Sequence, residues 1–166
     1  GGGIPIIEPL KQSLGGNRIN RVSGIINGTT NYILTRMADE GAAYADVLAE
    51  AQRLGYAEAD PAADVDGLDA ADKIAILSAL AFGGTVDRDA LPTTGISALQ
   101  GRDVEYARQL GYGVKLLAVA ERLAGQGDPL PLSLRVQPTL VPSDHPLAGV
   151  NGVNNAIVVE GEPVGR

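Results

Sequence analysis

The sequence contains no cysteine and a single histidine, His145, and each scarcity excludes a class of site. Without cysteine the chain forms no disulfide, binds no metal through thiolates and offers no cysteine nucleophile. One histidine cannot build a multi-histidine metal site, and most Ser-His catalytic arrangements are excluded. His145 stands in the segment Ser-Asp-His-Pro, which is typical of a loop. The lack of cysteine fits a reducing compartment, and we expect a cytoplasmic protein.

Basic residues, long apolar runs and phosphate-binding glycine motifs are also scarce. The chain has 13 Lys and Arg against 20 Asp and Glu, a net charge of −7 and a sequence pI of about 4.6. This balance argues against nucleic acid or an anionic membrane as a partner, because either requires a basic face. No apolar run approaches the ~20 residues of a membrane-spanning helix, and we expect no signal peptide. The glycine runs at residues 1–3 and 83–84 match neither the dinucleotide fingerprint nor a phosphate loop, and no serine lies in G-x-S-x-G.

The order of the expected elements predicts an α+β fold. At 166 residues the chain is long enough for a single sizeable core. Helices are predicted over residues 9–14, from the capping residues 27–29 to 41, and over 44–54, 68–82 and 102–110. Strands are predicted over residues 18–26, 95–97, 114–123, 130–141 and 156–160, with a turn at 161–162 into a further strand. Helices first and strands later favour a mixed β-sheet with helices packed on one face.

One stretch, residues 55–82, concentrates the polar chemistry of the chain. Its first half carries six carboxylates, and its second half is an apolar helical run that begins just after Lys73. The six acids are Glu58, Asp60, Asp64, Asp66, Asp69 and Asp72. Asp69 and Lys73 are four residues apart, which places them on one helix face with the acid N-terminal, the favourable order. Any active site in this chain is expected here.

A calcium loop is the first interpretation of so many acids, but the spacing does not fit it. If Gly67 takes the invariant glycine position of an EF-hand loop, Asp64 and Asp66 occupy the third and fifth positions. The first position is then Ala62, and the twelfth, which requires a bidentate Glu, is Lys73. The EF-hand interpretation therefore fails.

Two interpretations of the acidic stretch stay open on spacing alone. A lysine among carboxylates stays protonated and can donate a proton to a substrate oxygen, while a spare acid such as Glu58 can bind an ammonium group. The alternative is a plain helix salt bridge between Asp69 and Lys73 beside a solvated acidic loop, because such pairs are common. A second polar feature is the predicted helix start at residues 28–30, whose free N–H groups could bind a carboxylate or belong to an ordinary N-cap.

Five segments of the chain together resemble one known family. They read GGGIPII, GIINGTTNYILTRM, EAQRLGYAEADPAADVDGLDAADK, HPLAGV and NNAIVVEG. In this order and spacing they resemble the substrate-binding (catalytic) domain of homoserine dehydrogenase, and the resemblance covers essentially the whole chain. That family interconverts L-aspartate 4-semialdehyde and L-homoserine with NAD or NADP, on the route to threonine, methionine and isoleucine.

The resemblance implies a role for each site residue. Lys73 would donate the proton to the aldehyde oxygen, and Glu58 would bind the amino group of the substrate. Asp69 and Asp64 would help to hold the substrate and Lys73. The other residues expected to line the site are Tyr56, Gly28 and Thr29. The resemblance further implies a sodium ion held by backbone carbonyls, with Gly2 and Ile4 as ligands, and a homodimer formed through this domain.

The resemblance also implies parts that residues 1–166 do not include. The nucleotide-binding domain of the family, with a second site lysine, would precede Gly1, and a glycine-rich segment would follow Arg166. We therefore expect residues 1–166 to be a substrate-binding, catalytic and dimerisation domain that binds no cofactor and is inactive alone. The alternative is a non-catalytic ligand-binding or dimerisation module of the same fold. The combination of Glu58, Asp69 and Lys73 favours the enzyme, because a module without chemistry has no need of it.

Overall fold

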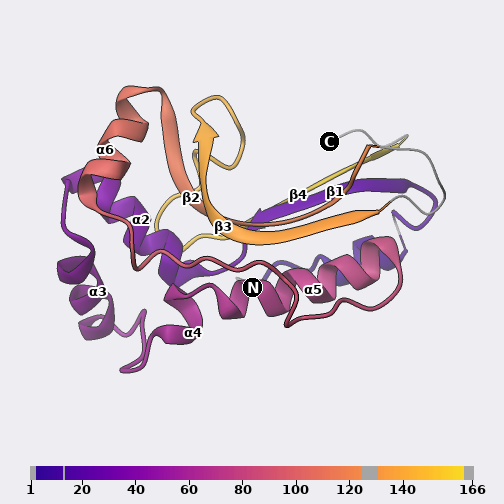
Figure 1. The fold of residues 1–166 in the computed structure, drawn as a ribbon, viewed down its shortest axis with the longest axis horizontal. Helices are drawn as coiled ribbons and strands as arrows, with labels where there is room; N and C mark the ends of the chain where they lie inside the picture. The colour runs from indigo at the N-terminus through magenta and orange to yellow at the C-terminus, as the bar shows by residue number, and fades with distance from the viewer. Residues whose placement is uncertain (1–2, 13, 125–130, 163–166) are drawn as a thin grey trace.

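A four-stranded sheet forms the centre of the molecule in the computed structural model, which describes residues 3–12, 14–124 and 131–162. The strand order is β3-β2-β1-β4, and all three pairings are antiparallel (Figure 1). The strands are β1 (Arg18–Ile25), β2 (Tyr112–Arg122), β3 (Leu132–Pro142) and β4 (Ala156–Glu162). The strand nearest the N-terminus is therefore an inner strand, held between two strands from the C-terminal half of the chain.

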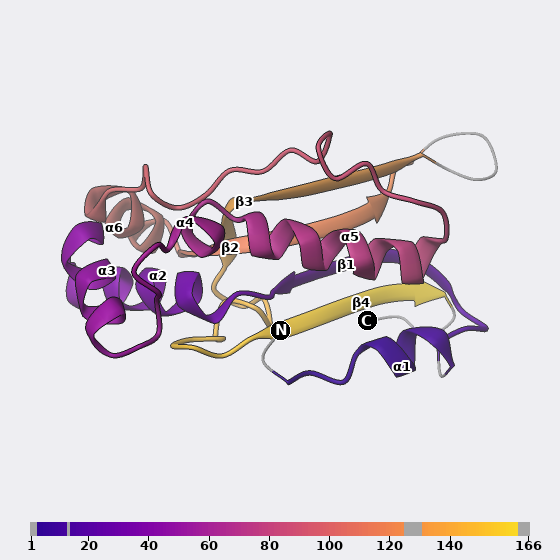
Figure 2. The same ribbon diagram turned by 90° about the horizontal axis from the view of Figure 1, so that it is seen from below.

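The long helix α5 (Leu68–Phe82) lies along one face of this sheet (Figure 2). Side chains alternate between the two faces of a strand, so one set of residues from each strand meets the helix. Val22, Ala118 and Val136 occupy this face in three neighbouring strands, and Ile74 of α5 is buried in the same cluster. Small residues in the middle strand allow close approach of the helix, and these contacts form most of the hydrophobic core.

Three further helices lie beyond one end of the sheet, to the left in Figures 1 and 2. They are α2 (Gly28–Glu40), α3 (Tyr44–Arg53) and α6 (Gly101–Gln109). Two short helices complete the fold: α1 (Ile7–Lys11) beside α5, and α4 (Ala62–Val65) just before it. No helix within the described ranges is both long and apolar enough to cross a bilayer.

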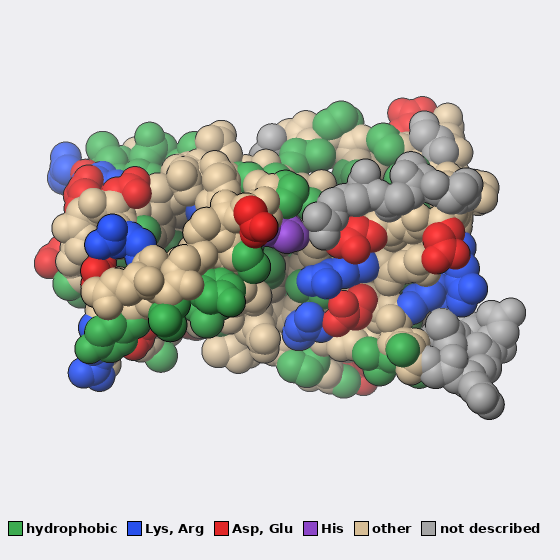
Figure 3. Space-filling model, turned by 90° about the horizontal axis from the view of Figure 1, so that it is seen from above, with side chains coloured by type: hydrophobic (Ala, Val, Ile, Leu, Met, Phe, Trp, Pro, Cys, Tyr) green, Lys and Arg blue, Asp and Glu red, His purple; other side chains and the backbone are tan. Residues whose placement is uncertain are grey.

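The other face of the sheet has a smaller apolar cluster and a group of charges. Ile25, Leu117 and Val119 pack there against Leu147, which comes from the loop between β3 and β4. Charged side chains on the same face are joined by ion pairs, and Figure 3 shows positive and negative groups interspersed there. These residues are Arg21, Glu121 and Arg135.

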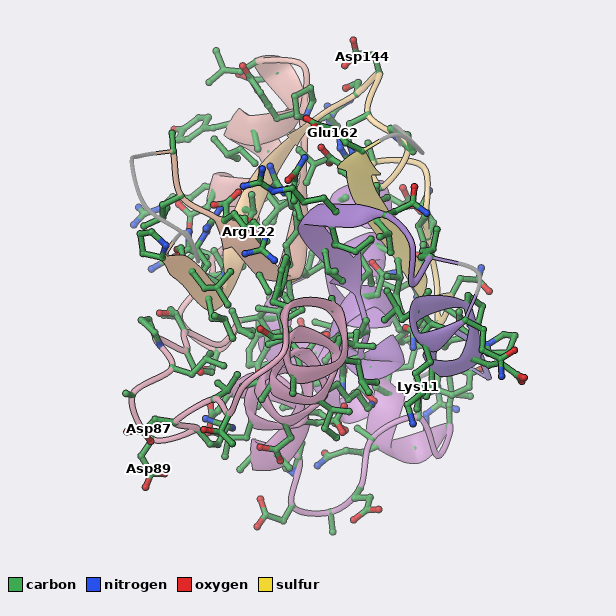
Figure 4. The ribbon with its side chains drawn as sticks, turned by 90° about the vertical axis from the view of Figure 1, so that its right-hand side faces the viewer. Lys11, Asp87, Asp89, Arg122, Asp144 and Glu162 are labelled. Carbon is green, nitrogen blue, oxygen red and sulfur yellow. The ribbon has the colours of Figure 1, made fainter. Side chains whose placement is uncertain are left out.

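One arginine anchors the end of α5 to the sheet. Arg122, at the end of β2, points into the space between the sheet and the helix (Figure 4). Its Nε donates to the carbonyl of Ile19 at 2.9 Å, and its guanidinium carbon lies 5.2 Å from the centre of the Phe82 ring. A cation–π contact and a hydrogen bond thus fix the C-terminal turn of α5 against β1 and β2.

The predicted α+β class with helices packed on the sheet is confirmed, and most elements begin and end within a few residues of their predicted bounds. The helix after residues 27–29 is capped by Asn27 and stops at Gly41, whose φ of 64° suits glycine. The predicted bounds of α5 match the structure. The predicted mixed sheet is almost purely antiparallel: the four strands pair only in antiparallel fashion, and one isolated parallel bridge joins Thr93 to Val136 of β3.

The predicted strand at residues 95–97 is wrong. Thr94 N bonds to the carbonyl of Val136, but Ile96 N bonds to the carbonyl of Val65, so this segment links β3 to α4 and extends neither. A Cβ at Gly95 would lie 2.1 Å from the carbonyl oxygen of Val65, which explains the glycine by close backbone approach. The short helix α4 itself was not predicted.

The first and last elements also differ from the prediction. The first helix begins at Ile7 and ends at Lys11, not over residues 9–14. Pro9 is tolerated as its third residue because the first N–H groups of a helix have no intrahelical acceptor. Residues 161–162 do not turn but continue β4, where Gly161 is paired with Ile19. A Cβ at Gly161 would meet the carbonyl oxygen of Arg18 at 2.8 Å, so a close strand approach requires the glycine.

Candidate active site

The first turn of α2 meets the acidic stretch at the start of α5. Asn27 has extended backbone angles and caps α2, since its Oδ1 accepts from Thr30 N at 2.9 Å. Its Nδ2 points away from the helix and donates to Asp64 Oδ1 at 2.6 Å and to Asp69 Oδ2 at 3.0 Å. One amide side chain thus caps a helix and bridges two carboxylates that the sequence predicts for the site.

Lys73 lies at the centre of this arrangement. Its Nζ donates to Asp69 Oδ2 at 2.5 Å and to the backbone carbonyl of Ile26 at 3.2 Å. The side chains of Lys73 and Asp69 are each 32% exposed, so the pair is partly shielded yet open to a ligand. Lys73 therefore does more than pair with Asp69 along the helix. Its bond to the carbonyl of Ile26 also ties Nζ to the residue that follows β1.

The electrostatics keep the carboxylate of Asp69 ionised. Partial burial acts to raise the pKa of Asp69, but hydrogen bonds from Lys73 and Asn27 and the charge of Lys73 outweigh it, so the pKa lies below its ordinary value. Lys73 Nζ faces this ionised carboxylate at 2.5 Å. The pair therefore offers a positioned N–H donor beside an ionised acid.

The residues predicted to line the site come together on the α2 side. Thr29 Oγ1 donates to the carbonyl of Tyr56 at 2.7 Å, which joins α2 to the segment after α3. The Tyr56 ring, 46% exposed, lies 5.0 Å from the ring of Tyr32 at an angle of 59°. A Cβ at Gly28 would lie 2.8 Å from the carbonyl oxygen of Val153, so the loop before β4 closes this side and requires a glycine.

Glu58 lies in the same segment as Tyr56, with its side chain exposed. Its backbone carbonyl accepts a hydrogen bond from Gln52 Nε2 at 3.1 Å, which holds the segment in place. Within the described ranges its carboxylate makes no hydrogen bond or ion pair. A carboxylate without a partner is available to bind a cation.

An apolar cavity of about 210 Å³ adjoins Lys73. Lys73 is the one charged residue among its described lining residues, and the other residues are aliphatic. They are Ile4, Ile6, Ile7, Ile26, Ile76, Leu77 and Ile157. A larger groove of about 490 Å³, between residues 83–92 and the ends of β2 and β3, contains no acid–base pair and lies away from Lys73. The smaller cavity is therefore the one that Lys73 lines.

The predicted sodium ligands are only partly within the described residues. Gly2 lies outside them, and the carbonyl of Ile4 accepts a hydrogen bond from Ile6 N at 2.9 Å. Among the residues that the structure describes, no group of three or more His, Cys, Asp or Glu side chains is placed to hold a metal ion.

The sequence missed the two groups that join the site. Asn27 was expected only to supply turn and capping chemistry, and the carbonyl of Ile26 was not considered. These contacts connect residues 42 and 47 positions apart in the chain. The one available signal was the position of Ile26-Asn27-Gly28 between a predicted strand and a predicted helix. The partners of Ile26 and Asn27 became evident only in the fold.

Comparison with known proteins identifies the family of the chain. A profile described as homoserine dehydrogenase matches residues 5–166. A homoserine dehydrogenase from Synechocystis is 61% identical over all 166 residues, and one from Corynebacterium glutamicum is 53% identical over 165 residues. The chain spans 38% and 37% of the lengths of these two relatives.

Solved structures agree as well. A homoserine dehydrogenase from Thiobacillus denitrificans superposes with a TM-score of 0.93 at 54% identity, over 99% of this chain and 37% of that one. A hyperthermophilic archaeal homoserine dehydrogenase mutant, solved in complex with NADPH, superposes with a TM-score of 0.76 at 33% identity, over 98% of this chain and 44% of that one. The family profile and the relatives cover nearly the whole length of this chain, and the chain therefore belongs to the homoserine dehydrogenase family.

Proposed function

We propose that residues 1–166 form the substrate-binding and catalytic part of an enzyme that interconverts L-aspartate 4-semialdehyde and L-homoserine with NAD or NADP. The observation that carries this proposal is the position of Lys73 Nζ, held between Asp69 and the carbonyl of Ile26 at the edge of an apolar cavity. A helix salt bridge needs neither the strand-end carbonyl nor the Asn27 bridge, so the arrangement favours a positioned proton donor over a plain ion pair.

Lys73 acts as the general acid in the direction of aldehyde reduction. A bound nicotinamide cofactor would supply a hydride to the aldehyde carbon, and negative charge would then develop on the oxygen. Lys73 Nζ donates a proton to that oxygen, and Asp69 stabilises the charged lysine and fixes its direction. In the reverse direction the neutral amine takes the proton from the hydroxyl of homoserine. The exposure of the pair leaves room for a substrate oxygen on the free side of Nζ.

The remaining groups suit a small amino acid. The unpaired carboxylate of Glu58 binds the ammonium group, and Asp64 helps to hold the substrate beside Lys73. The backbone N–H groups at Gly28 and Thr29 lie at the start of α2, where the helix dipole favours a carboxylate. Tyr56 forms an aromatic wall between these ends of the site.

The cofactor fits this site only in part. An aliphatic cavity beside Lys73 suits the face of a nicotinamide ring, with Ile4, Ile26 and Ile76 in its wall. A pyrophosphate requires backbone N–H groups at a glycine-rich helix start, and we propose that a domain outside residues 1–166 supplies these, as in the family. A sodium ion at Gly2 and Ile4 belongs to the same proposal. The carbonyl of Ile4 keeps one lone pair for it beside its bond to Ile6 N.

The setting of the enzyme follows from the same proposal. Homoserine formation places the protein in the biosynthesis of threonine, methionine and isoleucine, in the cytoplasm. We further propose a homodimer formed through the sheet-rich half of the chain. The face of the sheet not covered by α5, where half-buried charged side chains adjoin a small apolar cluster, supports this proposal (Figure 3).

The test is steady-state kinetics on the full-length enzyme that contains these residues. We expect reduction of L-aspartate 4-semialdehyde with NADH or NADPH, and loss of at least 99% of kcat in Lys73→Met, roughly the lower limit for a positioned general acid. Lys11→Met is the matched control, since this lysine lies on α1 outside the site and should leave kcat unchanged. A wild-type protein without turnover, but with measurable binding of homoserine, would instead support a non-catalytic ligand-binding module.

A further inference from the structure

A second lysine, Lys115, is buried in the middle of the fold and has no part in the chemistry proposed above. It lies on β2, on the face of the sheet that α5 does not cover, and is only 3% exposed. Its Nζ donates to the carbonyl of Val150 at 2.6 Å, to Asn151 Oδ1 at 2.9 Å and to Asn31 Oδ1 at 3.2 Å. An ammonium group has three N–H donors, and all three are used here, each by a neutral acceptor.

Burial of a charge among neutral acceptors is costly, so this lysine requires an explanation. Desolvation lowers the pKa of Lys115 to about 8, and the charge of Asp39, on α2, acts in the opposite direction. Its cross-strand neighbour on β3 is the neutral Thr139, and the loop contributes the neutral Asn151. At neutral pH Lys115 is therefore mainly an ammonium group. An apolar side chain would fill the same space without this cost.

Asn31 connects Lys115 with the active site. It is 1% exposed, and its Nδ2 donates to the carbonyls of Val150 and Asn154, both at 3.0 Å. Thr35, one turn further along α2, accepts from Gly152 N at 3.0 Å. These bonds attach residues 150–154 to the first two turns of α2. We call residues 150–154 the clamp loop.

The clamp loop closes on the same turn that carries the site residues. The carbonyl of Val153 lies against Gly28, so closely that a Cβ there would be 2.8 Å away. Asn27, which bridges Asp64 and Asp69, is the residue before Gly28, and Asn31 follows it by four positions. A shift of this turn moves the amide of Asn27 and with it the carboxylate that orients Lys73.

We propose that Lys115 is a positioning residue of the active site: through Asn31 and the clamp loop its ammonium group fixes the first turn of α2, and thereby places Asn27 and Asp69 around Lys73. The proposal rests on the proposed function for its effect on turnover, but the placement of α2 is independent of that function. A neutral amine has one donor fewer, so loss of the proton releases one of the three acceptors. Turnover then falls as Lys115 deprotonates, even though Lys115 does not touch the substrate.

The decisive variant is Asn151→Asp in the full-length enzyme. Asn151 is exposed, and the change replaces a neutral acceptor of Nζ with a carboxylate of the same shape. An opposite charge at this distance raises the pKa of Lys115 by ~1 unit or more. The ratio of kcat in the variant to kcat in wild type, for aldehyde reduction, should be near 1 at pH 7 and rise to about fivefold at pH 9. Groups that titrate alike in both proteins cancel in this ratio.

Asn154→Asp is the matched control, with the same added charge three residues along the clamp loop but no contact with Nζ. It also removes the hydrogen bond from Asn154 Nδ2 to the carbonyl of Asn151, so the control is the pH dependence: whatever its value at pH 7, the kcat ratio should stay flat between pH 7 and pH 9. A flat ratio in Asn151→Asp as well would overturn the proposal and reduce Lys115 to a packing role. Rescue of alkaline turnover by Lys115→Arg, which stays charged, would be a further supporting result.

Stability distinguishes failure of this proposal from failure of the proposed function. A folded-state pKa below the unfolded value means that the charged form of Lys115 disfavours folding, so its penalty disappears as the pH rises from about 8 towards 10.5. Asn151→Asp should therefore raise Tm relative to wild type at pH 7, and lose this advantage near pH 10. If wild-type turnover fell at high pH only because the protein unfolded, kcat and Tm would fall together. We expect instead that deprotonation of Lys115 lowers kcat while it raises Tm.

Amide hydrogen exchange tests the placement of the first turn of α2 independently of enzyme activity. In Lys115→Met, the amides of Thr30 and Asn31, which donate to Asn27 in wild type, should exchange at least tenfold faster, while amides of α5 stay unchanged. Equal exchange of these two amides in both proteins would overturn the positioning role, even if the wild type turns over homoserine. A wild type without turnover but with faster exchange in the variant would refute the proposed function and leave the positioning role supported.

Discussion

Asn27→Asp separates the two tasks of Asn27, because it preserves one and removes the other. An aspartate keeps the oxygen that accepts from Thr30 N, and aspartate is as good an N-cap as asparagine. It replaces the Nδ2 donor, however, with an oxygen at hydrogen-bond distance from Asp64 and Asp69. If Asn27 were only a cap, the variant would be as stable as wild type or gain ~0.3–1 kcal/mol from the helix dipole.

The bridge leads to the opposite expectation. Two unit charges 4 Å apart near a protein surface interact by roughly 4 kcal/mol, and the partial exposure of Asp69 reduces this substantially. With the loss of two hydrogen bonds to carboxylates, we expect destabilisation on the order of 2–3 kcal/mol at pH 7. Lys73 also loses part of its orientation, so kcat should fall roughly tenfold to a hundredfold, a part of the general-acid contribution.

The pH dependence provides the check on the cause. Because the folded-state pKa of Asp69 lies below its unfolded value in wild type, Asp69 stabilises the fold above about pH 4 and loses this contribution as the pH falls further. In Asn27→Asp the added charge raises the pKa of the acidic group, so mild acid should restore stability relative to wild type. The assay is thermal unfolding of the full-length protein at pH 7 and pH 5, together with kcat at pH 7. Asn27→Ser, which caps without charge, is the control. A variant with wild-type Tm at both pH values and kcat within twofold would refute the bridge.

The other variants test the remaining assignments. Lys73→Ala should lower kcat by roughly 10²–10⁴ with a smaller change in KM, because substrate binding rests mainly on other groups; near-normal kcat would leave a plain salt bridge. Glu58→Ala should raise KM for L-aspartate 4-semialdehyde and leave cofactor affinity unchanged, and an unaltered KM would remove Glu58 from the site. Gly28→Ala should displace the clamp loop at Val153 and lower Tm by several degrees, since the added Cβ would lie 2.8 Å from a carbonyl oxygen. Light scattering of the full-length enzyme should give a dimer, and a monomer at tens of micromolar would contradict the proposed assembly.

Local patterns were sufficient to predict much of the fold. The bounds of α5 were visible because Gly67 and Gly83, with φ values of 82° and 79°, flank a run of good helix formers. The pair Asp69 and Lys73 was predicted from its four-residue spacing alone, and the structure places the two at hydrogen-bond distance. Features with a period or a fixed spacing were thus accessible without the fold.

Features that depend on distant backbone were not accessible. The sequence does not show which glycines are required by a neighbouring carbonyl, so Gly95 was wrongly predicted to lie in a strand and Gly161 in a turn. The role of Asn27 was hidden for a similar reason, because its partners Asp64 and Asp69 come from another element. Lys115 gave no signal in the sequence either, since its acceptors lie up to 84 residues away.

The inner position of β1 has a consequence for synthesis of the protein on the ribosome. Its partner β4 comes late, and about 130 residues separate Ile25 from its partner Ala156. At roughly 5–20 residues per second, β1 waits on the order of ten seconds with at least one edge uncovered after it has been made. Such an edge is a template for pairing with other chains. Nascent chains of this protein should therefore depend on chaperones that shield β1 until residues 156–162 have emerged.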